Sequence, residues 1–531
     1  MRWRSARSLC LGWCLSWLAG CASLPDVSQR AHELTLPAAD ASPLGRTAAA
    51  ASDNGEFSGV RLLVSGHVSL NTRLELITRA QSSIDLQVYR FKGDATGRRV
   101  MRALRDAATR GVRVRVLVDD LYTLDDDLLL LGLAAQSGAQ VRLFNPFGFG
   151  RNSLWVRLMS ALFGAERLHR RMHNKLLVVD GVMAIAGGRN IGDEYYEATD
   201  AQLFYDFDVL VAGEVVPELA RTFDPYWNSS YSHDVAVVLG ETGADRSLLR
   251  KVFDEQVELG CAAPPCAAPL SVADSERGSW AVLAAEFQSE RLTMHRAQAS
   301  AAADAPEKIG AAATTDGNAL VAAGSEVRMR VAATIRGALE EIVIVSPYLI
   351  PGPNAEAALR EFRKRGVRVT LMTNSLAATD EPLVHVGYRR YRAALLREGV
   401  ELYEWSPVRS GRVFRQLLRG QTVLRLHAKC ALIDDHHVYL GSMNFDPRSR
   451  NLNTEFALLI HSPELAAEVA GFIHDMKRAG SYRVRLAADG ETLRWSPGEG
   501  GDDVEDVEPD TDFWSRLLLD LLSPFVPEEL L

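Results

Sequence analysis

Two stretches of this 531-residue chain carry residue types suited to chemistry on a phosphate ester, and their spacing is identical. One runs from His173 to Asn190 and the other from His427 to Asn444. In each, a histidine is followed by one residue, a lysine, four residues, an aspartate, six residues, a small pair, one residue and an asparagine. The residues expected to act on substrate are His173, Lys175, Asn190, His427, Lys429 and Asn444.

The chemistry that this set supports is transfer at a phosphodiester. Attack on phosphorus requires a nucleophile on one side and a proton donor for the leaving alkoxide on the opposite side. One histidine cannot occupy both positions, but one from each stretch can. Lysine and asparagine supply charge and hydrogen bonds to the phosphoryl oxygens, and the small Gly188 and Ser442 let the phosphate approach the backbone. The pattern predicts no metal ligands and no cofactor.

Local geometry explains the spacing. Side chains alternate across a strand, so His173 and Lys175 share one face. The apolar run 176–179 predicts a buried strand, and Asp180-Gly181 predicts a two-residue hairpin turn. A return strand at 182–186 then brings Asn190 back toward the imidazole and the ammonium. The second stretch repeats this with a less ideal Asp434-Asp435 turn.

The elements around the two stretches also repeat. Strands are predicted at 84–89, 112–118, 141–144, 342–345, 367–372 and 400–403, and helices at 97–110, 128–136, 355–365 and 385–397. Matching Arg-Gly-Val-Arg-Val segments begin at Arg110 and Arg365, an offset of roughly 255 residues that is also nearly the offset of the two histidines. The sequence predicts an α/β fold made of two similar halves whose pseudo-two-fold axis brings both histidines together.

Composition changes divide the chain into segments. We predict a signal peptide at 1–20, a flexible tether at 21–57, a first half at 58–239, a connector with some helix at 240–325, a second half at 326–480 and a C-terminal tail at 481–531. The tether is rich in Ala, Ser, Asp and Pro, and the connector contains Pro-Ala and Ala-rich runs without an expected counterpart in either half.

The paired motifs resemble those of the phospholipase D superfamily, and Gly188 is the only departure from the family pattern. Flanking segments at 142–146, 373–377, 444–449 and 452–455 resemble the bacterial cardiolipin synthase branch, especially its C type. The resemblance covers most of residues 60–480. It implies a duplicated phospholipase D-type fold with one shared active site.

The resemblance also implies roles for individual residues. His173 is the expected nucleophile and forms a phosphohistidine, although symmetry alone permits His427 instead. Asp180 and Asp434 are expected to support the turns, and Ser442 either to contact phosphate or only to tighten a turn. Glu455 is the expected acid that orients a catalytic imidazole, with Asp208 as its equivalent in the first half. The other histidines, including His436 and His437, are interpreted as ordinary polar residues.

The N-terminus predicts export and lipid anchoring. Arg2, Arg4 and Arg7 precede an apolar run, 9–18, which is too short for a membrane-spanning helix. The Leu-Ala-Gly-Cys sequence that follows resembles a bacterial lipoprotein box with Cys21 as the lipidated residue. The alternatives are an ordinary signal peptide or an uncleaved anchor. By resemblance to the sorting pattern of such lipoproteins, Ala22 after the cysteine favours a periplasm-facing protein of the outer membrane.

Other features leave alternatives open. Cys261 and Cys266 form either a small disulfide or two free thiols, whereas Cys430 is expected to be a buried apolar side chain. The amphipathic segments 153–163 and 513–531 predict helices that touch either a membrane or the protein core. Core packing is favoured for the second segment.

The function predicted from these observations is a phosphatidyltransferase of the cardiolipin synthase type. It would use phosphatidylglycerol as acceptor and phosphatidylethanolamine or a second phosphatidylglycerol as donor. A phospholipase D that releases phosphatidic acid is the main alternative, because no motif reports how well the site excludes water. A periplasmic nuclease and a non-catalytic lipid-binding protein are less favoured. The net charge of −9 and the predicted anchor argue against a nucleic-acid partner.

Overall fold

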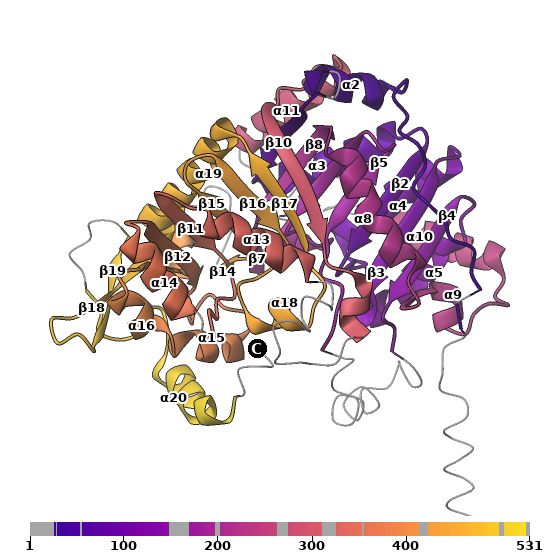
Figure 1. The fold of residues 1–531 in the computed structure, drawn as a ribbon. Helices are drawn as coiled ribbons and strands as arrows, with labels where there is room; N and C mark the ends of the chain where they lie inside the picture. Colours follow the sequence, from indigo (N-terminus) through magenta and orange to yellow (C-terminus); the bar gives the residue numbers. More distant parts are fainter. Residues whose placement is uncertain are drawn as a thin grey trace, which may run out of the picture.

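The computed structural model of this chain describes residues 26–27, 29–53, 56–147, 169–196, 202–262, 274–310, 325–352, 355–413, 423–498 and 504–526. Within them, seventeen strands join in one continuous sheet, and two further strands form a separate ribbon. Figure 1 shows the two halves of this sheet side by side, with helices packed around them. No helix of these residues has the length and apolar content needed to cross a bilayer.

The strands are β1 (Ser58–Leu63), β2 (Ser83–Val88), β3 (Arg113–Asp119), β4 (Ala139–Phe144), β5 (Leu176–Val179), β6 (Met183–Gly187), β7 (Gln202–Tyr205), β8 (Asp208–Gly213), β9 (Ser232–Asp234), β10 (His295–Ala303), β11 (Glu341–Val345), β12 (Arg368–Asn374), β13 (Glu401–Trp405), β14 (Val423–Leu426), β15 (Cys430–Ile433), β16 (His437–Gly441), β17 (Phe456–His461), β18 (Ser481–Leu486) and β19 (Leu493–Pro497).

The helices are α2 (Pro43–Ala51), α3 (Gly66–Arg79), α4 (Ala95–Thr109), α5 (Asp127–Ala134), α8 (Val216–Asn228), α9 (Val235–Val238), α10 (Arg246–Ala262), α11 (Asp274–Gln288), α13 (Glu326–Arg336), α14 (Ala355–Lys364), α15 (Pro382–Arg389), α16 (Arg392–Arg397), α17 (Pro407–Val413), α18 (Pro447–Asn451), α19 (Pro463–Asp475) and α20 (Phe513–Leu522).

The two halves share one topology. In the first, β2, β3 and β4 are parallel neighbours, and β2 also pairs with the antiparallel run β5-β6-β8-β1. In the second, β11, β12 and β13 are parallel, and β11 pairs with the antiparallel run β15-β16-β17-β10. The predicted duplicated α/β fold is confirmed. The helix predicted at 385–397 is two helices, α15 and α16.

Strand β10 corrects the predicted connector. Its residues 295–297 pair with β1 and its residues 298–303 pair with β17, so it joins the two halves of the sheet (Figure 1). In the second half β10 occupies the position that β1 occupies in the first. The second half therefore begins before residue 326, inside the segment that the sequence assigned to a connector. The prediction failed because His-Arg-Ala-Gln-Ala-Ser-Ala-Ala-Ala has few β-formers, and pairing with strands of both halves overrides that weak propensity.

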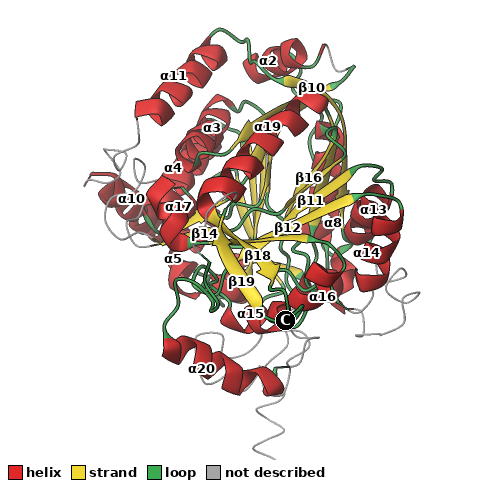
Figure 2. Ribbon diagram, turned by 90° about the vertical axis from the view of Figure 1, so that its left-hand side faces the viewer, coloured by secondary structure: helices red, strands yellow, loops and turns green. Residues whose placement is uncertain are grey.

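The three largest apolar cores of the described residues hold the two halves together. One lies under α3, α4, α5 and α10 of the first half, and another under α13, α14 and α16 of the second. The third lies between the halves and contains residues of β1, β8 and α8 together with residues of β15, β16, β17 and α19. Figure 2 shows the strands enclosed between these helices. Successive residues of the run 176–179 alternate between two cores, which explains why the whole run is apolar.

The aspartates of the paired motifs support the fold. Asp180 and Gly181 have positive φ values of 54° and 66°, and the Val182 N–H donates to the Val179 carbonyl at 3.1 Å, as the predicted tight turn requires. The Asp180 carboxylate accepts backbone N–H bonds of 2.7–3.1 Å from residues 81–83. Asp434 accepts equivalent bonds of 2.8–2.9 Å from residues 339–341. Both carboxylates therefore tie a hairpin turn to the loop before the first parallel strand of its half.

The predicted amphipathic segments and cysteines are only partly covered by the described residues. The segment 153–163 and Cys21 lie outside the described residues, as do Cys266 and the side chain of Cys261, so the disulfide stays a prediction. Helix α20 is packed on the protein mainly through Leu519, against Leu376 and Val386. Its Phe513 and Trp514 are 60% and 73% exposed, so the favoured core packing applies to one edge of this helix.

Cys430 offers a test of the core between the halves. Its side chain is fully buried at the start of β15 in the second histidine hairpin, and burial raises the pKa of its thiol far above the usual range. We expect Cys430→Ala to lower the free energy of unfolding by roughly 1–2 kcal/mol, because it leaves a small void in this core. Urea unfolding measures the loss. A variant as stable as the parent would show that the core is looser than described.

Candidate active site

The imidazole of the first motif is oriented by a carboxylate of the other half. His173 Nδ1 lies 3.0 Å from Glu455 Oε2 and 3.0 Å from the Ser442 carbonyl oxygen. Both neighbours are acceptors, so Nδ1 carries the proton and Nε2 is left free for phosphorus. A parallel bridge between Met172 and Thr454 sets this contact, because it places the residue before His173 beside the residue before Glu455.

The second imidazole is oriented by the same crossed arrangement. His427 Nδ1 lies 2.6 Å from Asp206 Oδ2, and both side chains are buried. The ribbon of β7 and β14 produces this contact: the strands run parallel, one ends just before Asp206 and the other just before His427. Tyr195 and Phe204 contact the ring, with centroids 5.3 Å and 5.0 Å from it.

The predicted orienting acid Asp208 is therefore wrong, and Asp206 takes that role. Asp208 Oδ2 instead lies 3.0 Å from Arg73 Nη2 and 3.1 Å from Arg189 Nη1, and it accepts a 2.7 Å bond from Ser69. The physical reason is its position at the start of β8, where it pairs with Gly187 and faces the interior of the first half. Asp206 directly follows β7 and lies before β8, so it stays beside the ribbon of β7 and β14.

Gly188, which replaces the serine of the family pattern, is explained by the position of Asp206. In the second half, Ser442 Oγ donates a 2.5 Å bond to Glu455 and accepts the Phe456 N–H at 2.9 Å, so its hydroxyl holds the acid in place. In the first half, a Cβ on Gly188 would lie only 2.2 Å from an Asp206 carboxylate oxygen. One half pairs serine with glutamate, and the other pairs glycine with the shorter aspartate, which must approach more closely.

Two buried lysines face the site from opposite halves. Lys175 Nζ donates to the His173 carbonyl at 2.5 Å, and Lys429 Nζ donates to the His427 carbonyl at 2.6 Å. The pKa of Lys175 is held well below its usual range, mainly by burial and secondly by repulsion from the charge of Lys429. Burial also lowers the pKa of Lys429, to about 8. An anion between the two ammonium groups would relieve both effects. The site is therefore preorganised for a phosphate group.

The same burial makes both histidines neutral. Burial and the charge of Lys175 lower the pKa of His173 to about 4, despite the opposing effect of Glu455. Burial and Lys429 hold the pKa of His427 well below its usual range. A neutral imidazole is the form that attacks phosphorus. A bound phosphate offsets the lysine charges, which raises the pKa of the imidazole that must act as the acid.

The asparagines are placed differently in the two halves. Asn190 Nδ2 donates to the Tyr195 hydroxyl at 2.9 Å and its Oδ1 accepts the Arg90 N–H at 3.2 Å. Asn444 Oδ1 is buried without a hydrogen-bond partner among the described residues. Ser449, which the sequence did not single out, donates to Glu455 at 2.7 Å and accepts the Asn444 N–H at 3.1 Å. It links the second asparagine to the orienting acid.

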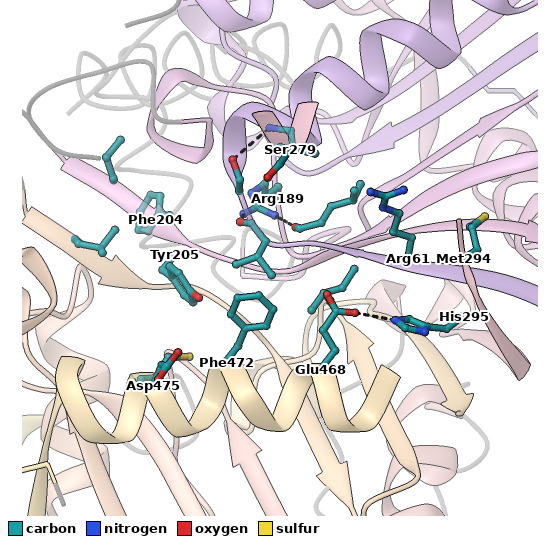
Figure 3. A pocket seen from close by; sticks show the side chains of 18 of the residues that line it. Arg61, Arg189, Phe204, Tyr205, Ser279, Met294, His295, Glu468, Phe472 and Asp475 are labelled. Carbon is teal, nitrogen blue, oxygen red and sulfur yellow. Dashed lines mark hydrogen bonds and ion pairs between the residues drawn. The ribbon is translucent and has the colours of Figure 1, made fainter. Parts of the chain in front are cut away.

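A cavity of about 700 Å³ adjoins the His427 side of the site. Figure 3 shows it between Phe204 and Tyr205 of the first half and Glu468 and Phe472 of helix α19. Phe204 lines the cavity and also contacts the His427 ring, so it separates the two spaces. The cavity combines apolar side chains with ion pairs at its edge, among them His295 and Glu468 at 3.1 Å.

Comparison with known proteins agrees with this geometry. The family model described as cardiolipin synthase, PLD-like domain matches residues 74–227 and 331–476, one copy in each half. The chain belongs to this family. It is 36% identical over 487 residues to cardiolipin synthase C of Escherichia coli K12, which covers 86% of this chain and 93% of that protein. An uncharacterized protein of Helicobacter pylori (strain ATCC 700392 / 26695) is 31% identical over 474 residues, 88% of each chain.

A solved structure agrees with the fold. The crystal structure of phosphatidylserine synthase from Haemophilus influenzae Rd KW20 matches with a TM-score of 0.54 and covers 92% of this chain and all of that one. At 13% identity this likeness concerns the fold alone. With the family match, the fold and family predicted from the paired motifs are confirmed.

The two neighbouring aspartates allow a direct test of the corrected assignment. Asp206→Asn leaves the shape of the site but removes the charge that orients His427, so we expect turnover to fall by about 10³-fold or more with little change in unfolding temperature. Asp208→Asn removes a buried charge that two arginines share, so we expect it mainly to lower stability. Steady-state rates and thermal unfolding of both variants decide between them. The opposite outcome, with Asp208→Asn inactive but stable, would restore the original assignment.

The lysine pair predicts how activity changes with pH. Because burial lowers the pKa of Lys429 to about 8, kcat/KM should fall as the pH rises through that value and the ammonium loses its proton. Arginine keeps its charge at these pH values, so Lys429→Arg should move the alkaline limb upward even where the maximal rate is lower. The exposed Lys251→Arg is the control. An unchanged alkaline limb in Lys429→Arg would assign it to another group.

Proposed function

We propose that this chain is a phosphatidyltransferase of the cardiolipin synthase type, which transfers a phosphatidyl group to phosphatidylglycerol. The observation that carries the proposal is the crossed pairing of two buried imidazoles with acids of the opposite halves, beside two lysines whose pKa is lowered by burial. Relatives that share the fold and most of the chain length carry the name cardiolipin synthase.

In the first step, His173 Nε2 attacks the phosphorus of the donor phospholipid. The bond to the head-group oxygen breaks, and that oxygen takes a proton from protonated His427. Glu455 accepts the His173 Nδ1–H bond and stabilises the positive charge that develops on the ring. Lys175 and Lys429 stabilise the charge on the phosphoryl oxygens. The product is a phosphatidyl group bonded to His173 and a free head-group alcohol.

In the second step, neutral His427 removes the proton from a hydroxyl of phosphatidylglycerol. The resulting oxygen attacks phosphorus, the phosphorus–nitrogen bond breaks, and cardiolipin leaves. His173 regains its lone pair, and His427 regains its proton for the next cycle. The choice of His173 as nucleophile follows the family pattern, because the crossed geometry is nearly symmetric. The donor is phosphatidylethanolamine or a second phosphatidylglycerol.

Membrane attachment through a lipidated Cys21 would complete this function, with the protein facing the periplasm from the outer membrane. An anchor of this kind holds the site near the bilayer that contains its substrates. Two features of the described residues support a lipid substrate. Helix α20 exposes a row of apolar side chains, and the cavity beside His427 is lined largely by apolar groups that suit hydrocarbon chains.

The test is product analysis. The purified chain is incubated with labelled phosphatidylethanolamine and phosphatidylglycerol in the presence of a chelator, and the products are resolved by chromatography. We expect cardiolipin. Phosphatidic acid alone would identify a phospholipase D that ends in water, and DNA cleavage without lipid turnover would identify a nuclease. Either outcome contradicts the proposal.

Substitution of either motif histidine tests the two-sided mechanism. His173→Ala and His427→Ala should each abolish turnover, because each imidazole serves one side of the same phosphorus. His474→Ala, an exposed residue of α19, is the control for the loss of a histidine. A His427→Ala enzyme with the full steady-state rate would contradict the two-sided mechanism.

A further inference from the structure

Three histidines gather at the end of the second half that lies away from the active site. His436 is in the turn between β15 and β16, His437 begins β16, and His461 ends β17. His437 and His461 are direct partners in the antiparallel pairing of β16 with β17. The cluster therefore comes from two neighbouring strands, with His437 and His461 24 residues apart in the sequence and aligned by the sheet.

The three imidazoles are mutually close. Their ring centroids are separated by 4.5 Å for His436 and His437, 4.7 Å for His437 and His461, and 5.2 Å for His436 and His461. One nitrogen atom of each ring lies within 4.8 Å of a nitrogen of both others. Three nitrogen atoms around one tetrahedral zinc lie roughly 3.3 Å apart, so the ring nitrogens would move closer together on binding.

One of the rings is already oriented for a ligand. His436 Nδ1 lies 2.9 Å from Asp435 Oδ1, which fixes the proton on that nitrogen and leaves Nε2 as a donor of electrons. A carboxylate on the far nitrogen is the usual partner of a metal-bound histidine. The His436 carbonyl also accepts the Ser462 N–H at 3.0 Å, which holds the turn against the end of β17.

The ligand type of the cluster points to a transition metal, because all three residues offer an imidazole nitrogen. Neutral imidazole is the form that binds a metal, and imidazole nitrogens suit zinc, copper and nickel.

We propose that His436, His437 and His461 form a binding site for a divalent transition metal, with Zn²⁺ as the ion of first choice. Three imidazole nitrogens supply three of the four positions of a tetrahedral ion. The fourth position faces solvent, because His461 is exposed and the other two rings are partly exposed. Such an ion would cross-link the hairpin turn to the end of β17 and stabilise this edge of the second half.

This site is separate from the proposed reaction. The histidines lie at the His437 end of β16, whereas Ser442 follows its other end, about five residues or roughly 17 Å away. None of the three histidines contacts His173, His427 or their acids in the described contacts. The proposal therefore stands or falls independently of the phosphatidyltransferase activity.

The experiment is a metal titration of the full-length chain, purified without a polyhistidine tag and stripped with a chelator that is then removed. Isothermal titration calorimetry with Zn²⁺ measures affinity and stoichiometry, and thermal unfolding with and without Zn²⁺ measures stabilisation. Co²⁺ provides a second probe, because three imidazoles in a tetrahedral site give it a visible absorption band. His437→Ala and His461→Ala are the test variants, and His474→Ala is the matched control.

We expect one equivalent of Zn²⁺ per chain, a higher unfolding temperature with Zn²⁺, and a dissociation constant that rises at least about tenfold in each test variant and stays unchanged in His474→Ala. The unfolding temperatures of the metal-free variants confirm that they fold. Absence of saturable binding in the parent protein would overturn the proposal. Equal affinity in the parent and in His437→Ala and His461→Ala would overturn it as well.

Discussion

The structure depends on a pair of crossed contacts in which each half provides the carboxylate that orients the histidine of the other. Glu455 of the second half holds His173, and Asp206 of the first half holds His427. Two parallel main-chain pairings set these contacts: the bridge between Met172 and Thr454, and the ribbon of β7 and β14. Neither half contains an oriented imidazole by itself. The active site forms only when the halves pack together.

That dependence explains why an extensive apolar core lies between the halves. The apolar core shared by α8, α19 and the inner strands holds them in one relative position, and β10 continues the sheet from one half to the other. A hydrogen bond of 2.6–3.0 Å to an imidazole tolerates little relative movement. A closely packed core limits such movement, because small changes of volume in it are costly.

The electrostatics of the site follow from the same geometry. Packing the halves together buries two lysines and two histidines around one point, and the burial lowers the pKa of all four. This arrangement costs free energy until an anion is bound, so part of the binding energy of a phosphate comes from relieving it. The supporting aspartates, Asp180 and Asp434, lie apart from this point and hold the loops before the first parallel strand of each half.

The sequence allowed prediction of the features that depend on neighbouring residues or that are repeated in both halves. The paired motifs, their hairpins and the parallel strands around them could be predicted because alternation and spacing record them directly. Asp206 was missed because two acids lie two positions apart, and only the long-range pairing of β7 with β14 decides which one meets His427. Strand β10 was missed because its alanine-rich sequence has no strand signal of its own. The histidine cluster was missed because His437 and His461 are brought together only by strand pairing.

The most direct measurement of the central claim is a crystal structure of the chain with orthovanadate, which adopts the five-coordinate geometry of phosphoryl transfer. The account predicts one vanadium atom between the halves, bonded to Nε2 of one of the two catalytic histidines. Nε2 of the other should lie within hydrogen-bond distance of the oxygen on the opposite side. Vanadate bound to one imidazole alone, with the second ring directed elsewhere, would contradict the account.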